Sequence, residues 1–281
     1  MNHLLNVTKS DGSKQLFEEE KLVSSLKRVG ASPEAIEEVL DEVEKEMTDG
    51  MKTSDLYGRA FALLRKHSIP SAVKYSIRRA MMELGPDGFP FEKFVARIFT
   101  MWGYQTLTDQ TVLGGCVDHE MDVVAWKDND LAMVEAKYHN EFGMKTDVKV
   151  ALYVKARFDD IATTTFNYGD MERKLTERWL ITNTKFTDKA IKYSECNHLK
   201  ILGWNYPDSN NLHDIIEQNG LHPISCLTTL SRQQKMDLIG RNILVCIDIV
   251  GKPDILDSIG VKGVEAEKVL TEAQIIIEQA K

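Results

Sequence analysis

Apolar and polar positions follow three different patterns along the chain. Residues 1–85 begin with two short alternating segments joined at Asp11-Gly12 and continue with amphipathic helical segments, which predicts a mostly helical unit with a small sheet. Residues 86–225 combine apolar strand-like runs with helical segments, and residues 226–281 are helical in pattern. Gly85-Pro86-Asp87-Gly88 is the clearest linker, because glycine and proline favour turns. We therefore predict a multidomain protein of α+β and α/β class with these three domains.

The middle domain contains a hairpin-like pair of apolar runs. MDVVAW and LAMVEAKYH flank a polar tetrapeptide, and the only charges inside the runs are Asp122, Glu135 and Lys137. If Asp128-Asn129 forms a two-residue loop, Asp122 lies opposite Glu135, and Lys137 shares their face. Opposed carboxylates on an apolar hairpin are costly unless a cation lies between them. The pattern predicts a divalent metal site; a structural ion pair of Lys137 with one carboxylate is the alternative.

Composition narrows the function further. Of 281 residues, 43% are hydrophobic and 28% charged, and the net charge is −8. These values are typical of soluble globular proteins and argue against a protein that coats DNA through a globally basic surface. The segment KTDVKVALYVKARF could still supply a local basic strip, or simply a solvated helix face, through Lys145, Lys149, Lys155 and Arg157. With no membrane-span-length apolar run and no signal-like start, we expect a cytoplasmic protein.

Asp122 followed by Glu135-x-Lys137 on consecutive strands resembles the signature of the PD-(D/E)XK nuclease superfamily. The wider context, roughly residues 89 to 225, resembles restriction endonucleases of the Mrr kind. It includes a helix with Glu92, the glycine-rich approach LGGCVDHEMDVVAW, the Thr-Asn strand RWLITNTKF and the strand HLKILGW. HEMD departs from the usual Gly-Asp-x-Gly-x-Asp, whereas Glu-Ala-Lys restores an acidic ligand where many relatives have Gln-x-Lys.

The resemblance implies an αβα core with a mixed central sheet and a metal-dependent endonuclease that cleaves DNA, in defence against foreign DNA. It implies that Asp122, Glu135 and the Ala136 carbonyl hold Mg²⁺ or Mn²⁺, metals that prefer oxygen ligands. Glu92 would reach the metal directly or through water. Lys137 would orient or help deprotonate the attacking water and steady the phosphate charge.

The first domain resembles the ATP-cone, a nucleotide-sensing module. The resemblance covers roughly residues 3 to 84 and rests on Val7-x-Lys9-x-Asp11-Gly12, Phe17 with Lys21, Gly50 with Lys52-Thr53, and Tyr75-x-x-Arg78-Arg79-Ala80. It implies an allosteric ATP or dATP site, with Val7 and Lys9 at the base or phosphates, Lys21 at the phosphates, and Lys52-Thr53 at a helix start. The usual Lys-Arg pair is here Lys9-Ser10. A cone kept only as a dimerisation wedge is the alternative.

The last domain resembles a helix-hairpin-helix through Leu256, Ile259-Gly260-Val261, Gly263 and Ala266-Glu267-Lys268-Val269-Leu270. If this element binds DNA, Lys262 is the residue nearest a phosphate. A helical packing or oligomerisation element is equally compatible with the pattern.

Two functions follow from these patterns. The first is a metal-dependent deoxyribonuclease gated by ATP or dATP and acting as a homo-oligomer on DNA. The second is a non-enzymatic, nucleotide-responsive DNA-binding regulator, whose hallmark would be a zinc ribbon beside the cone. The four cysteines form no C-x-x-C pair, so the sequence favours the nuclease.

Overall fold

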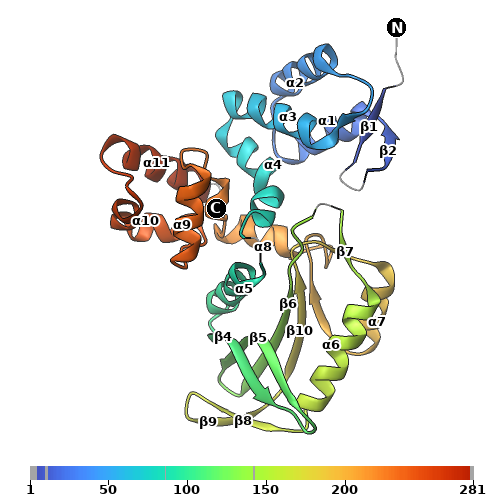
Figure 1. The fold of residues 1–281 in the computed structure, drawn as a ribbon, viewed down its shortest axis with the longest axis vertical. Coiled ribbons are helices and arrows are strands. Elements are labelled where there is room, and N and C mark those ends of the chain that lie inside the picture. Colours follow the sequence, from blue (N-terminus) through green and yellow to red (C-terminus); the bar gives the residue numbers. More distant parts are fainter. Residues whose placement is uncertain (1–4, 10–11, 86, 142, 279–281) are drawn as a thin grey trace.

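The computed structural model describes residues 5–9, 12–85, 87–141 and 143–278. Figure 1 shows a helical N-terminal part with a small sheet, a central mixed sheet flanked by helices, and a helical C-terminal part. This arrangement confirms the predicted fold class. None of the helices in the described ranges is long and apolar enough to cross a membrane.

The N-terminal part joins a three-stranded sheet to four helices. Its elements are β1 (Asn6–Thr8), β2 (Lys14–Leu16), α1 (Glu19–Arg28), α2 (Pro33–Glu46), β3 (Met51–Lys52), α3 (Thr53–His67) and α4 (Ile69–Met82). β1 pairs antiparallel with β2 and parallel with β3. Ser10 and Asp11, in the expected Asp-Gly turn, lie outside the described residues, and Gly12 has a φ of 79°, a conformation that glycine adopts at little cost.

The central part is built on a five-stranded mixed sheet in the order β12-β10-β6-β5-β4. Its strands are β4 (Gln105–Leu113), β5 (Asp118–Lys127), β6 (Asp130–Lys137), β10 (Glu177–Thr182) and β12 (Lys200–Leu202). β4, β5 and β6 pair antiparallel, whereas β10 runs parallel to both β6 and β12. Two short pairs accompany the sheet: β7 (Lys145–Thr146) with β11 (Lys185–Phe186), and β8 (Thr165–Tyr168) with β9 (Met171–Lys174).

Helices cover both faces of this sheet. α5 (Phe89–Met101) packs on one face, where its phenylalanines meet Val123, Ala125 and Val134. α6 (Val148–Ile161) and α7 (Asp188–Cys196) lie on the other face, against Val124 and Met133. Alternate residues of β5 and β6 therefore enter different cores, which is why both strands are almost continuously apolar.

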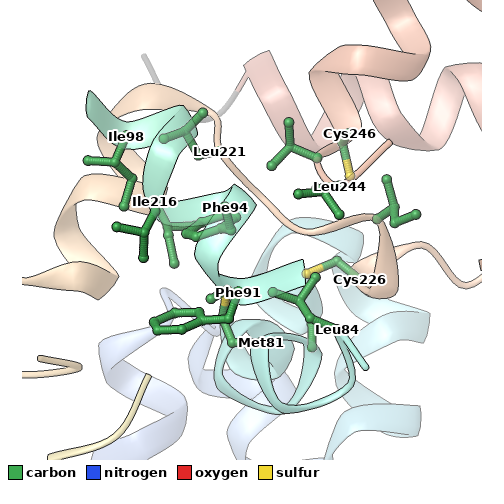
Figure 2. Close-up of a cluster of buried hydrophobic side chains, with 14 of the residues drawn as sticks. Met81, Leu84, Phe91, Phe94, Ile98, Ile216, Leu221, Cys226, Leu244 and Cys246 are labelled. Atoms are coloured by element: carbon green, nitrogen blue, oxygen red, sulfur yellow. The ribbon is translucent and has the colours of Figure 1, made fainter. Parts of the chain in front are cut away.

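One hydrophobic core connects all three parts of the chain. Met81 and Leu84, at the end of the N-terminal part, lie beside Phe91 and Phe94 of α5 and beside C-terminal residues such as Leu244 (Figure 2). The Ser225 hydroxyl also donates to the Ala80 carbonyl over 2.7 Å, in a buried position. Helix α4 thus belongs structurally to the core of the central part as well as to the N-terminal part.

The C-terminal part is a set of short helices docked on α5. It comprises α8 (Leu212–Asn219), η1 (Ile224–Cys226), α9 (Arg232–Gly240), α10 (Cys246–Gly251), η2 (Pro253–Ile259) and α11 (Val264–Glu278). Lys93 donates to Asn242 over 2.6 Å, and Arg97 pairs with Asp248 over 2.9 Å. A turn between η2 and α11 leaves Lys262 exposed.

Candidate active site

The hairpin β5–β6 has the register that the sequence predicted. Lys127 pairs with Asp130 across the loop of Asp128 and Asn129, and Val123 pairs with Val134. Asp128 has a φ of 49°, as a two-residue hairpin loop requires. The paired ladder ends at Val123 and Val134, so Asp122 and Glu135 occupy the next position on each strand.

Asp122 lies where regular pairing breaks down. Its Oδ2 accepts a hydrogen bond from the Ala136 backbone N–H over 2.6 Å, so a carboxylate takes the place of a ladder carbonyl. Met121 and Val124 enter the same core cluster, although strict alternation would place them on opposite faces. Opposite Asp122 on β4, Asp109 has a φ of 56°. The local irregularity fixes the Asp122 side chain beside the β6 backbone.

Glu135 is paired with an arginine from the neighbouring helix. Arg157 Nη1 of α6 donates to Glu135 Oε2 over 2.5 Å, and the two side chains are only 12% and 18% exposed. Arg157 Nη2 also donates to the Glu120 carbonyl oxygen. The expectation that Arg157 belongs to a basic surface strip is therefore wrong. Lys155, from the same segment, pairs instead with Asp159 of α6 over 2.6 Å.

Crowding of buried carboxylates shifts their proton affinity. Burial raises the pKa of Glu135 to about 7, and the Asp122 charge adds to the rise despite Arg157. Burial also raises the pKa of Asp122, an effect that the Ala136 N–H partly offsets. The pKa of Glu92 rises to about 7 through burial and the charges of Asp122 and Asp109. The site therefore carries an excess of negative potential.

Glu92 comes from a different element than this pair, whereas Lys137 follows Glu135 on β6. Glu92 is in the first turn of α5, near Gly88 and Tyr138, and Lys137 is exposed at the end of β6. Within the described ranges, no three His, Cys, Asp or Glu side chains converge closely enough to hold a metal ion. Asp122, Glu135 and Glu92 are therefore not close enough together to form a three-ligand group in this arrangement.

The Thr-Asn end of β10 fixes the chain that leaves the site. Asn183 is fully buried, accepts from the His139 N–H over 2.9 Å and donates to the His139 carbonyl over 2.7 Å. The His139 ring also contacts buried Thr146, whose hydroxyl donates to Thr182. These bonds satisfy buried polar groups and hold the segment after Lys137 in place.

The glycine-rich approach to β5 is shaped by Asp160 of α6. Its carboxylate accepts from the Cys116 N–H over 2.8 Å and contacts the His119 ring over 2.8 Å, and the His119 contact lowers the pKa of Asp160 to about 2. A Cβ on Gly114 would lie 2.2 Å from Asp160 Oδ2 and 2.7 Å from the Val117 carbonyl. Only glycine fits there. In the sequence, the adjacent glycines Gly114 and Gly115 were the feature that could have indicated this close contact.

The predicted nucleotide residues lie on the small sheet and on the helices that follow it. Thr8 pairs with Lys52, so Lys9 follows β1 beside the start of α3 at Thr53. Val7 is buried, whereas Lys9, Lys21 and Lys52 are exposed. Lys21 pairs with Glu18 over 2.8 Å. The bonds from Lys21 and Gln15 lower the pKa of Glu18, and the charge of Lys9 adds a smaller effect.

Known proteins match each part of the chain. Family models match residues 5–81 (ATP cone domain), 85–206 (Restriction endonuclease) and 222–277 (AF1548-like, C-terminal). An uncharacterized protein of Archaeoglobus fulgidus is 34% identical over 184 residues, which is 65% of this chain and 99% of that protein. The crystal structure of the protein of unknown function AF1548 is similar at 33% identity with a TM-score of 0.56, covering 68% of this chain and 99% of that one.

The mixed sheet between helices, with Asp and Glu-x-Lys on adjacent strands, places the central part in the restriction endonuclease-like class of nuclease domains. The chain belongs to the AF1548-like family, and it carries an ATP-cone domain before an Mrr-type restriction endonuclease domain and the AF1548-like C-terminal region. The resemblances to the ATP-cone and to the Mrr-type nuclease domain are thereby confirmed.

A pH-dependent stability follows from the raised carboxyl pKa values. Because the folded state binds these protons more tightly than the unfolded chain, the stability contribution is present below about pH 4 and is lost as pH rises towards about 7. In the presence of a metal chelator, Asp122→Asn should keep the Ala136 hydrogen bond and remove one charge. We expect its melting temperature to exceed the wild-type value by a few degrees near pH 8, and the gain to shrink towards pH 5.

Scanning fluorimetry across this pH range checks the expectation. Asp118→Asn, at the exposed start of the same strand, is the matched control and should show no such pH-dependent gain. A variant Asp122→Asn that melts below wild type at every pH would show that repulsion between the carboxylates is not the dominant effect.

Proposed function

We propose that this protein is a metal-dependent deoxyribonuclease that hydrolyses phosphodiester bonds and is regulated by ATP or dATP bound to its cone. The observation that carries the proposal is the pair of half-buried carboxylates Asp122 and Glu135, next to Lys137, within a restriction endonuclease domain. A buried acidic pair with raised pKa values is unfavourable by itself, so its presence in a nuclease fold supports a role in catalysis.

The donor set fits a hard divalent cation such as Mg²⁺ or Mn²⁺. The Asp122 and Glu135 carboxylates and the Ala136 carbonyl would hold it, and water or phosphate oxygens would complete its shell. Arg157 already supplies one positive charge to Glu135, which supports the view that this position calls for a cation. When bound, a divalent cation would neutralise charge on the scissile phosphate and activate water.

Three residues near the carboxylates would have the remaining catalytic and positioning roles. Lys137 is exposed at the end of β6, where its ammonium group would orient the attacking water and stabilise the phosphate charge. Glu92, whose pKa is raised to about 7, would act through water and could exchange a proton near neutral pH. Asn183 would keep the backbone beyond Lys137 in position through its two bonds to His139.

The cone supplies the proposed regulation. Lys9 and Lys52 lie near the start of α3 at Thr53, and a helix start with nearby lysines suits a triphosphate. Lys21 of α1 would add a further phosphate contact. We further propose that nucleotide controls assembly of a homo-oligomer and so pairs the active sites, in a setting of defence against foreign DNA. The rival function, a non-enzymatic DNA-binding regulator, would not need the Asp122/Glu135/Lys137 set.

Substitution of the site residues tests the nuclease. Glu135→Gln and Lys137→Ala should each reduce Mg²⁺-dependent plasmid cleavage by about 10²-fold or more, because each removes a group acting on the transition state. Glu172→Gln and Lys174→Ala, exposed on β9, change charge in the same way away from the site and should cleave normally. Full cleavage by both active-site variants would refute the assignment.

Arg157 should compete with the metal for Glu135. We expect Arg157→Gln to tighten Mn²⁺ binding by about tenfold, equivalent to ~1.4 kcal/mol, because the cation no longer has to displace a guanidinium. Calorimetric titration without DNA measures this directly. Lys155→Gln removes a charge from the same helix, where Lys155 pairs with Asp159, and should leave the affinity near wild type. Weaker Mn²⁺ binding by Arg157→Gln would instead make Arg157 a support for the site.

Nucleotide binding is tested in the cone. Lys9→Ala and Lys21→Ala should each weaken ATP or dATP binding by about tenfold or more, since charge-assisted phosphate contacts contribute ~1.5–3 kcal/mol. Calorimetry measures the loss, and Lys66→Ala, exposed near the end of α3, is the control.

Mass photometry without nucleotide, with ATP and with dATP tests the proposed assembly. Identical mass distributions together with nucleotide-independent cleavage would rule out gating by assembly.

A further inference from the structure

Four basic side chains gather where the cone meets the nuclease domain. Lys145 and Lys185 are partners in the two-stranded pairing of β7 with β11. Arg28, at the end of α1, and Arg78, late in α4, come from the cone, and their charges act on Lys185 together with that of Lys145. We call these four residues the junction cluster. Figure 1 shows β7 at the end of the nuclease domain that lies nearest the cone.

The junction cluster lacks compensating acids. Within the described part of the chain, none of its members forms an ion pair, and Arg78 Nε is buried without a hydrogen-bond partner. Burial lowers the pKa of Lys185, and the charges of Arg78, Lys145 and Arg28 lower it further. In a chain of net charge −8, four cations held together without a carboxylate are costly unless an anion joins them.

The position of the cluster indicates which anion. Thr182, the last residue of β10, pairs with Lys137, the last residue of β6. Lys185 follows Thr182 by three residues, so the cluster lies just beyond the strand end that carries Lys137. Tyr138, next to Lys137, donates to the Met82 carbonyl over 2.6 Å and the Gly85 carbonyl over 3.1 Å. These contacts hold the end of β6 against the end of α4, the helix that carries Arg78.

The cluster is separate from the predicted nucleotide residues. Lys21 lies near the start of α1, whereas Arg28 is the last residue of that helix. Arg28 and Lys145 are exposed, and Lys185 and Arg78 are half-buried. A large, extended ligand can therefore reach residues of both domains at once, which suits a polymer backbone better than a single small anion.

We propose that the junction cluster binds the phosphate backbone of DNA entering the active site, so that the cone contributes directly to substrate binding. This inference rests on the proposed nuclease function and extends it. Arg28 and Arg78 would contact phosphates from the cone, and Lys145 and Lys185 would contact them from the nuclease domain. Such contacts carry no sequence information but position the duplex. Because the site spans both domains, a change in cone position would change DNA affinity.

The test uses the full chain, a fluorescent duplex and a metal chelator, so that binding is measured without cleavage. Arg28→Gln/Lys145→Gln neutralises one exposed residue from each domain and spares the half-buried pair. We expect DNA affinity to fall by about tenfold, and the slope of log K against log salt to decrease in magnitude by roughly 2, because about 0.9 is lost per phosphate contact. Arg65→Gln/Lys66→Gln, exposed on α3, makes the same charge change and should bind like wild type.

The other outcomes separate the two proposals. If wild type binds DNA and the junction variant has the same affinity and salt slope, the inference is wrong while the nuclease proposal stands. If wild type binds no DNA and cleaves none in Mg²⁺, both fail. Calorimetry with ATP and dATP then measures nucleotide binding, which should be normal in the junction variant. Lost nucleotide binding with unchanged DNA binding would overturn the inference and assign the cluster to a nucleotide.

Discussion

The repulsion between the half-buried carboxylates of Asp122 and Glu135 is the constraint on which the site depends. Each neighbouring feature limits its cost: the Ala136 N–H binds one carboxylate, Arg157 pairs with the other, and Lys137 lies on the same strand as Glu135. The pKa values nevertheless remain raised. The surrounding sheet must therefore be stable enough to hold charges that would separate or protonate in a looser structure, and its two apolar cores provide that stability.

Helix α4 connects this site to the cone. Its buried residues share a core with α5 and the C-terminal helices, and the Met82 carbonyl at its end accepts a hydrogen bond from Tyr138. Tyr138 directly follows Lys137, so any displacement of α4 acts on the residue beside the catalytic strand end. The junction cluster lies along the same boundary. The cone and the nuclease domain are therefore in direct contact through α4, which the proposed nucleotide regulation would need.

Local patterns were sufficient to predict much of this architecture. The two-residue loop at Asp128-Asn129 was enough to predict the hairpin register, because in a hairpin the length of the loop decides which residues pair. The linker around Gly85, the helix of Glu92 and the Thr-Asn strand end were also recognisable, since each depends on residues close together in sequence. The resemblance to the restriction endonuclease domain followed from these segments.

The sequence by itself determined which strands hold the candidate site residues and how those strands pair, because turn chemistry and strand pattern act over a few residues. It did not determine what surrounds them. Arg157 reaches Glu135 only because α6 packs across the sheet, Asp160 reaches the glycine pair for the same reason, and Arg78 meets Lys185 only because α4 joins the nuclease core. These contacts link residues distant in sequence and depend on how helices pack on the sheet, which only the tertiary structure decides.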